Sequence, residues 1–152
     1  MDRSPNPDFV ELLEAFERHG VCYLMIGGYA VSLQGHPRAT KDLDLWLESS
    51  PENIESACQA LVDFVAPAHV VESLRSIRAG EVVFLGVEPF RIDLMTWIPG
   101  GDFDAAWARR ERREWGEQPV WVISRADLIR AKRAAGAPQD IADAAILEML
   151  ED

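Results

Sequence analysis

Two aspartates, Asp42 and Asp44, lie one residue apart in a segment that is otherwise leucine and tryptophan. Side chains of a β-strand alternate between its two faces, so both carboxylates would point to one side while the intervening leucines point into a core. Like charges held side by side raise each other's pKa unless a cation lies between them. The pair therefore predicts a site for a hard divalent cation, such as Mg²⁺, completed by water and phosphate oxygens.

A glycine pair, Gly27-Gly28, separates the apolar segment 21–26, predicted to be a strand, from a short helix predicted over 29–33. Glycines let a ligand approach the backbone, and the unpaired amides at a helix start attract anions. Ser32 lies one helical turn further on and adds a hydroxyl donor. We therefore expect the phosphates of a nucleoside triphosphate at this turn.

A third acid, Asp93, lies in a second apolar segment, 90–97. Its neighbours Ile92 and Leu94 are expected to face the core, so Asp93 would face the opposite side. Three carboxylates are suited to phosphoryl-type chemistry, in which metal ions neutralise phosphate charge and a carboxylate accepts the proton of the attacking hydroxyl.

The rest of the chain provides elements that would position these residues. The predicted order gives an α+β fold with a small mixed β-sheet flanked by helices, followed by a helical C-terminal part. Segment 66–78 is ambiguous, with a weak strand pattern at 69–71. We predict helices over 7–20, 29–33, 51–64, 102–115, 124–134 and 139–150, and strands over 21–26, 42–48, 82–87, 90–97 and 119–123, with 82–87 and 90–97 antiparallel around the turn 86–89.

Composition limits the function classes. The 152 residues are 48% hydrophobic with a net charge of −11, which predicts one globular domain over 1–152, with a catalytic core at 1–100 and a mainly helical part at 101–152. The negative charge disfavours a broad grip on nucleic acid. Cys22 and Cys58 lie in apolar surroundings, and the sequence has neither an apolar signal core at 1–8 nor a membrane-length apolar run. A cytoplasmic protein is expected.

The joint pattern resembles the nucleotidyltransferase superfamily, which has the polymerase-β-like fold. It consists of Gly27-Gly28, the segment 36–40 (His-Pro-Arg-Ala-Thr) and the segment 41–45 (Lys-Asp-Leu-Asp-Leu). The chain looks most like small bacterial toxin nucleotidyltransferases of the AbiEii and MenT types, whose loop carries arginine and threonine ahead of the aspartate pair. Arg38 and Thr40 match those positions, and Lys132 with segment 136–143 resembles their C-terminal helices. The resemblance covers residues 20–150.

The resemblance implies metal-dependent transfer of a nucleoside monophosphate from an NTP to an acceptor hydroxyl, with release of pyrophosphate. It implies that Gly27 and Gly28 form the phosphate-binding turn and that Asp42, Asp44 and Asp93 bind Mg²⁺ or Mn²⁺, with Asp93 as the base. The acceptor would be a tRNA, a protein side chain or a small hydroxylated molecule. A toxin-like role would imply a cognate antitoxin. One departure is segment 137–139, where many relatives carry a basic residue.

Each signal also has a structural interpretation. Alternating acids and leucines describe many solvent-facing edge strands. Arg38 fits an ion pair as well as a phosphate contact, Thr40 fits a local backbone bond, and Ser32 fits helix packing. Asp140 and Asp143 are expected to stabilise the start of the last helix.

The basic run Arg109, Arg110, Arg112 and Arg113 is typical of a solvated, salt-bridged helix face, with an acceptor-phosphate surface as the alternative. Two rival functions remain open at this point. One is a catalytically silent nucleotide-binding or partner-regulated module of the same fold. The other is a metal-dependent phosphohydrolase.

Overall fold

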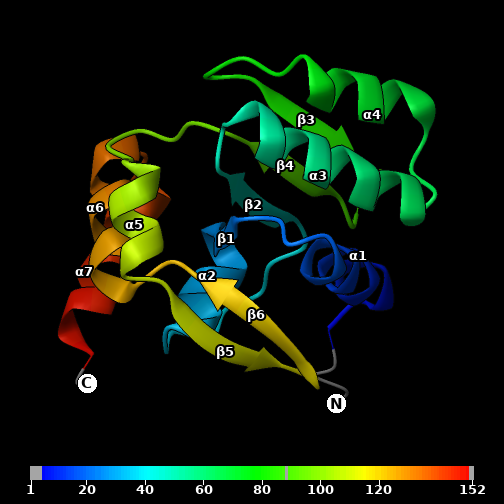
Figure 1. Ribbon diagram of the computed structural model, residues 1–152. Helices are drawn as coiled ribbons and strands as arrows, with labels where there is room; N and C mark the ends of the chain where they lie inside the picture. The colour runs from blue at the N-terminus through cyan, green and yellow to red at the C-terminus, as the bar shows by residue number, and fades with distance from the viewer. Residues whose placement is uncertain (1–4, 88, 151–152) are drawn as a thin grey trace.

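The computed structural model describes residues 5–87 and 89–150 (Figure 1). Within them, one six-stranded sheet has the order β3-β4-β2-β1-β6-β5. The predicted mixed sheet flanked by helices is confirmed. The helices are α1 (Pro7–Arg18), α2 (Gly27–Leu33), α3 (Pro51–Asp63), α4 (Ala68–Arg75), α5 (Phe103–Ala108), α6 (Arg125–Ala135) and α7 (Pro138–Met149); the strands are β1 (Tyr23–Ile26), β2 (Leu43–Leu47), β3 (Val82–Leu85), β4 (Ile92–Met95), β5 (Glu111–Trp115) and β6 (Gln118–Val122).

Both parallel and antiparallel pairs occur in the sheet. β1 runs antiparallel to β2, while β2 and β4 are parallel neighbours. β3 adds to β4 as an antiparallel partner, and on the other side β6 lies parallel to β1 and antiparallel to β5. The parallel β2–β4 pair aligns the beginnings of the two strands that carry Asp44 and Asp93.

The helices form two groups (Figure 1). Helices α1, α3 and α4 pack against one another on one side, and α5, α6 and α7 gather on the other. Leu43, Leu45 and Leu47 of β2 are fully buried. Trp46, on the opposite face of the same strand, meets Phe103 of α5 edge-on with ring centroids 5.1 Å apart. The face that carries Asp44 is therefore the one that faces α5.

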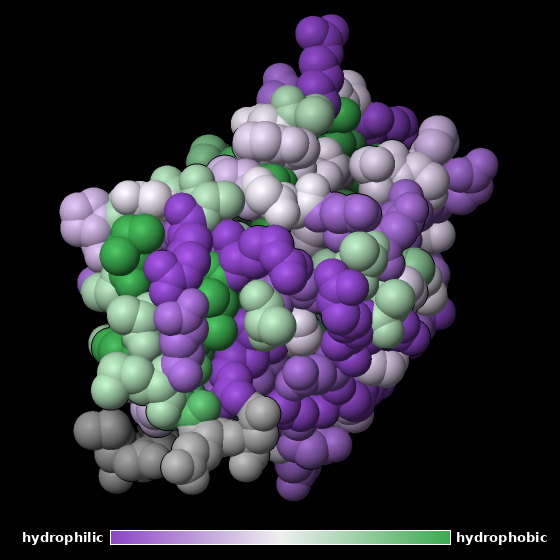
Figure 2. Space-filling model, turned by 90° about the vertical axis from the view of Figure 1, so that its left-hand side faces the viewer, coloured by the Kyte–Doolittle hydropathy of each residue, from purple (hydrophilic) through white to green (hydrophobic). Residues whose placement is uncertain are grey.

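Local sequence signals account for the helix starts. The side chains of Asn6, Ser50 and Ser124 each accept a backbone N–H in the first turn of α1, α3 and α6 respectively. Such caps satisfy amides that have no partner within the helix. Figure 2 views the side where α5, α6 and α7 lie and shows a largely hydrophilic surface with smaller hydrophobic areas between. No helix in the described ranges is long and apolar enough to cross a membrane.

One local prediction was wrong. The helix predicted over 102–115 ends at Ala108, and β5 then forms a hairpin with β6 around Gly116, whose φ is +63°. Arg112 and Arg113 therefore lie on a strand. Hydrogen bonding to β6 outweighs the helical charge spacing of this segment.

The weak strand pattern at 69–71 belongs to α4 instead. Val70, Val71 and Leu74 are buried at helical spacing.

The predicted β3–β4 antiparallel pairing is confirmed, although its turn includes residue 88, which lies outside the described residues. The single domain over 1–152 stays a prediction; strands from both sides of residue 100 share the one sheet.

Candidate active site

The sheet brings Asp44 and Asp93 side by side. Each is the second residue of its strand, and the parallel β2–β4 register places the two Cα positions opposite each other. Asp42 lies immediately before β2, with a side chain that is 31% exposed. Asp93 is buried on the same face rather than turned into the hydrophobic core. The geometry thus brings together three acids that lie up to 51 residues apart in the sequence.

Gly27 closes this site from β1. Ile26, the last residue of β1, lies opposite Asp44, and Gly27 follows with φ +73°. A Cβ on Gly27 would overlap Oδ2 of Asp44. The sequence suggested that the missing side chain leaves room for a ligand; in the structure, the Asp44 carboxylate occupies that room.

Gly28 has the same relation to Thr40. A Cβ on Gly28 would lie 2.6 Å from Oγ1 of Thr40. The hydroxyl of Tyr29 donates to the backbone carbonyl of Thr40 at 3.3 Å. The glycine pair therefore lets two neighbouring side chains, Asp44 and Thr40, press against the turn at the start of α2.

The carboxylates oppose one another electrostatically. Burial, followed by the negative charges of Asp93 and Asp42 and a hydrogen bond to Asp93, raises the pKa of Asp44 to about 7; the positive charge of Lys132 acts in the other direction. A carboxyl group with such a pKa is only partly ionised at neutral pH. The site holds more negative charge than its own cations neutralise, which is the condition that favours a bound metal ion.

Arg91 is a site residue that sequence reasoning missed. Its Nε donates to Oδ1 of Asp93 at 2.7 Å and its Nη2 to Oδ2 at 3.1 Å. The same Nη2 lies 3.5 Å from Oδ2 of Asp42. The available signal was the spacing, because a residue two positions before Asp93 lies on the same face of the strand.

Lys132 approaches the site from α6, and a buried aspartate holds it there. Its Nζ lies 3.2 Å from Oδ2 of Asp143 and 3.4 Å from Oδ1 of Asp140. Asp143 is fully buried, and it also pairs with Nη2 of Arg38 at 3.2 Å. Arg38 thus makes the ion pair that was one of its two predicted roles.

The two aspartates of α7 have different surroundings. Asp140 accepts the backbone N–H of Ala137 at 3.3 Å, which agrees with its predicted role at the start of the helix. Asp143 instead joins Arg38 from the loop before β2 to Lys132 from α6. The helix dipole alone does not offset the cost of burying a charged carboxylate, so a fully buried acid such as Asp143 requires charged partners.

Ser32 of α2 contacts the loop that precedes β2. Its Oγ is 3.4 Å from both the backbone nitrogen and the carbonyl oxygen of Arg38. The contact anchors the loop 36–42 to α2. Ser32, Arg38 and Thr40 are thereby gathered near the glycine turn, each already held by a protein partner.

A cavity of about 250 Å³ opens next to Asp44. Asp44, Lys132 and Asp140 are its charged residues, and most of its wall is apolar. It lies between the end of β1, the segment after β4 and α6. The lining residues are Ile26, Gly27, Asp44, Met95, Ile98, Pro99, Leu128, Ala131, Lys132, Ala135 and Asp140.

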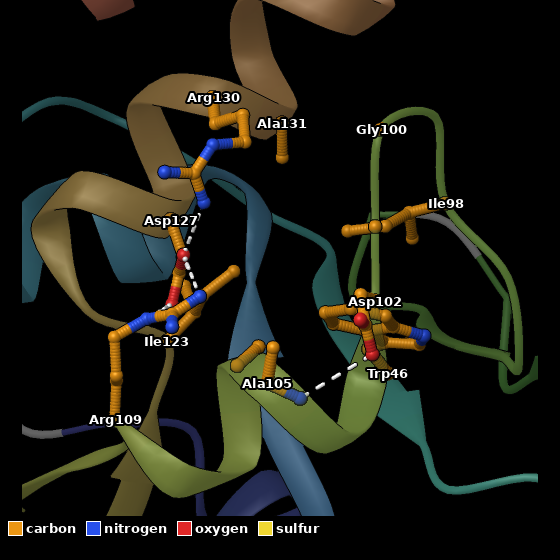
Figure 3. Close-up of a pocket in the computed structure, with 12 residues that line it drawn as sticks. Trp46, Ile98, Gly100, Asp102, Ala105, Arg109, Ile123, Asp127, Arg130 and Ala131 are labelled. Carbon is orange, nitrogen blue, oxygen red and sulfur yellow. Dashed lines mark hydrogen bonds and ion pairs between the residues drawn. The ribbon is translucent and has the colours of Figure 1, made fainter.

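A second cavity, of about 210 Å³, shares Ile98 and Ala131 with the first. Figure 3 shows Arg109 and Arg130 converging on Asp127 at one wall of it. Burial alone would raise the pKa of Asp127, but hydrogen bonds from Arg109 and Ser124 and the charge of Arg109 lower it overall. This carboxylate is neutralised by the protein itself.

The donor set at the first site fits Mg²⁺ or Mn²⁺. These ions prefer carboxylate oxygens, and Asp44 lies opposite Asp93 in the β2–β4 register with Asp42 two residues before it. Among residues 5–87 and 89–150, no three His, Cys, Asp or Glu side chains are already arranged as a ligand set. In this conformation Arg91 holds both oxygens of Asp93.

Comparison with known proteins gives structural neighbours only. No family model matches the chain, and no curated protein matches it as a sequence relative. The lincosamide antibiotic adenylyltransferase LnuA, solved with lincomycin bound, superposes with a TM-score of 0.62 at 14% identity, covering 99% of this chain and 100% of that one. A Thermotoga maritima protein described as a candidate nucleotidyltransferase gives 0.59 at 13% identity, covering 92% and 88%.

The antibiotic-resistance factor ANT(2'')-Ia gives a TM-score of 0.58 at 13% identity, covering 92% of this chain and 80% of that one. Likeness at this level of identity establishes the fold. The chain has the nucleotidyltransferase fold, as the sequence motif predicted. Closeness to the AbiEii and MenT toxins stays a prediction.

Proposed function

We propose that this protein is a metal-dependent nucleotidyltransferase that moves a nucleoside monophosphate from an NTP to an acceptor hydroxyl. The observation that supports this most strongly is the register pairing of Asp44 with Asp93 beside the Gly27 turn. In the nucleotidyltransferase fold, that arrangement joins hard oxygen ligands to a backbone turn suited to phosphates. The cavity beside Asp44 is where we place the nucleotide.

The residues of the chain divide the work of the reaction. The turn at Gly27 and Gly28 would receive the triphosphate, and Lys132 would neutralise part of its charge. Asp42, Asp44 and Asp93 would hold Mg²⁺ or Mn²⁺. When bound, the metal withdraws charge from the phosphates and lowers the pKa of the acceptor hydroxyl.

The proposed bond changes are balanced. The acceptor oxygen attacks the α-phosphorus and forms a new P–O bond, while the bond between the α-phosphorus and its bridging oxygen breaks. Pyrophosphate leaves with that electron pair. Asp93 accepts the acceptor's proton as a carboxylate, once one of its oxygens is free of Arg91.

For the acceptor, we propose a small hydroxylated molecule. The neighbour LnuA carries lincomycin, and an ANT(2'')-Ia structure contains adenylyl-2''-tobramycin. LnuA also matches this chain over its full length. A tRNA or protein acceptor, with a cognate antitoxin as partner, is the second candidate; it is supported by the toxin-like sequence motif at residues 27–45.

We also propose a cytoplasmic location. Cys22 and Cys58 are free thiols, which supports the proposal that the protein works in a reducing compartment such as the cytoplasm.

Incubation with each of the four NTPs, labelled at the α-phosphorus, with Mg²⁺ or Mn²⁺, tests the function. Acceptors would be total tRNA, cell protein and a panel of hydroxylated small molecules. Label on an acceptor with an equal amount of pyrophosphate is the expected result. Release of inorganic phosphate would instead indicate a phosphohydrolase, and nucleotide binding without turnover a silent module; either contradicts the proposal.

Asp63→Asn provides a matched control for Asp44→Asn in that assay. Asp63 is an exposed carboxylate at the end of α3 that pairs with His19. The same chemical change far from the site should leave transfer intact.

A further inference from the structure

Arg91 contacts two of the three carboxylates, those of Asp93 and Asp42. It is the residue immediately before β4, and its guanidinium forms two parallel hydrogen bonds with Asp93, at 2.7 and 3.1 Å. Its Nη2 reaches Asp42 at 3.5 Å, and its backbone N–H donates to Oδ1 of Asp42 at 3.4 Å. A bidentate arginine–carboxylate pair is among the stronger polar contacts in proteins.

These contacts leave the three acids unequal. Arg91 provides a direct positive partner for Asp93 and Asp42. Asp44 is attracted by Lys132, yet burial and its acidic neighbours keep its pKa raised. The guanidinium therefore occupies one flank of the cluster and both oxygens of Asp93.

We propose that Arg91 is a positioning residue that sets the affinity of the carboxylate cluster for divalent cations, because it competes with the cation for the oxygens of Asp93. The inference rests on the proposed function, which places the metal at these acids. An oxygen that bonds a guanidinium in the same direction is not available to a metal ion. Binding of the cation then requires Arg91 to give up at least one of its two bonds.

The surroundings of Arg91 permit that exchange. Its side chain is 29% exposed, so the guanidinium borders solvent. Its Cζ lies 4.3 Å above the ring of Phe84, which faces Asp93 across the β3–β4 pair. An aromatic ring retains a cation without offering a directed acceptor. Arg91 can loosen from Asp93 while remaining on Phe84.

Calorimetric titration of Mn²⁺ into the metal-free, full-length protein tests the inference. Arg91→Gln removes the charge and the fork, and we expect it to bind Mn²⁺ roughly tenfold more tightly, the gain from removing one charge-assisted competitor. Arg91→Lys retains the charge without the bidentate geometry, so its Mn²⁺ affinity should lie between those of wild type and Arg91→Gln. Without metal, Arg91→Gln should melt at a lower temperature than wild type, and Mn²⁺ should restore it.

Arg75→Gln is the matched control. Arg75 makes the same bidentate pair with Glu55, at 3.1 and 3.2 Å, on the exposed surfaces of α3 and α4. Its loss should not change Mn²⁺ affinity.

Equal or weaker Mn²⁺ binding by Arg91→Gln and Arg91→Lys would overturn the inference, since it would mean that Arg91 organises the ligands rather than competing for them. The failures are distinguishable. If Asp44→Asn abolishes Mn²⁺ binding but the Arg91 variants match wild type, only this inference fails. If neither wild type nor Asp44→Asn binds Mn²⁺, both this inference and the proposed metal site fail.

Discussion

Asp44, which is partly buried, and Asp127, which is buried, line adjoining cavities on the same side of the sheet, but the charges around them have opposite signs. Asp127 is held by Arg109 at 2.9 Å and by Arg130 at 2.6 Å (Figure 3). The Ser124 hydroxyl also donates to it, at 3.0 Å. Asp44 faces other acids. Their pKa values shift accordingly, down for Asp127 and up to about 7 for Asp44.

The difference distinguishes Asp127, an acid paired within the fold, from Asp44, an acid that we propose binds a metal ion. Asp127 has its counter-ions supplied by the fold, so ionisation stabilises the native state. Asp44 has acidic neighbours that make its charge unfavourable, and a bound cation would relieve that repulsion. Burial alone does not distinguish them; the sign of the surrounding charge does.

The largest expected effect is on activity. Asp44→Asn removes a charged ligand while keeping the side-chain shape, so transfer should fall by about 10³-fold or more, as when a principal electrostatic group is lost from an active site. The initial rate of label transfer measures this. Asp127→Asn, compared at equal concentrations of folded protein, should change the rate only a few-fold. Equal losses of transfer rate in both variants would contradict the distinction between Asp44 and Asp127.

The next effect is on stability, where the Asp127 variant should lose more than the Asp44 variant. Asp127→Ala leaves two arginines without their shared carboxylate and removes a hydrogen bond from Ser124, so the free energy of unfolding should fall by about 2 kcal/mol. Urea denaturation in the presence of a chelator measures it. The same experiment on Asp44→Asn should give a protein at least as stable as wild type.

The pH dependence of stability follows from the two pKa shifts. The folded protein retains the Asp44 proton up to about pH 7, whereas the unfolded chain releases it near pH 4. The folded state therefore binds more protons across that window, and the stability of the metal-free protein should fall by about 4 kcal/mol as the pH rises through it.

Asp127 contributes a pH dependence of stability with the opposite sign. Its pKa is lowered in the folded state, so its contribution is present above about pH 4 and is lost as the pH falls below that. Denaturation curves across the range should show that Asp44→Asn removes the decline toward neutral pH and leaves the acid-side loss in place. An unchanged decline in Asp44→Asn would assign it to another group.

The smallest effect concerns the cap of α6. Ser124→Ala removes the hydroxyl that accepts the Asp127 backbone N–H at 3.1 Å, and should cost about 1 kcal/mol of stability. Thermal denaturation measures the change. Because α6 also carries Lys132, the KM for NTP is a second readout, and we expect it to stay close to the wild-type value.

Local signals in the sequence were sufficient for much of the fold. The caps at Asn6, Ser50 and Ser124 and the alternation around Asp44 depend only on near neighbours in the chain, and each appears in the structure. The hairpin that contains Arg112 was missed because its charge spacing suits a helix equally well. Pairing with β6 decides the outcome, and local spacing does not encode it.

The site was predictable in its acids but not in its counter-ions. Alternation placed Asp44 and Asp93 on the strand faces opposite the core leucines, yet only the parallel β2–β4 register brings them together. The pairing of Asp143 with Arg38 spans 105 residues, so no spacing rule could give it. Arg91 was within reach, two positions from Asp93, but its bond to the acid depends on the side-chain conformation.

A crystal of the protein grown with Mn²⁺ and a non-hydrolysable NTP analogue tests the central claim most directly, through the anomalous signal of manganese. The account predicts a peak within ligand distance of the Asp44 and Asp93 carboxylates, with the triphosphate at the Gly27-Gly28 turn and none at Asp127. A peak at another group, or a nucleotide bound with no metal near Asp44, would contradict it.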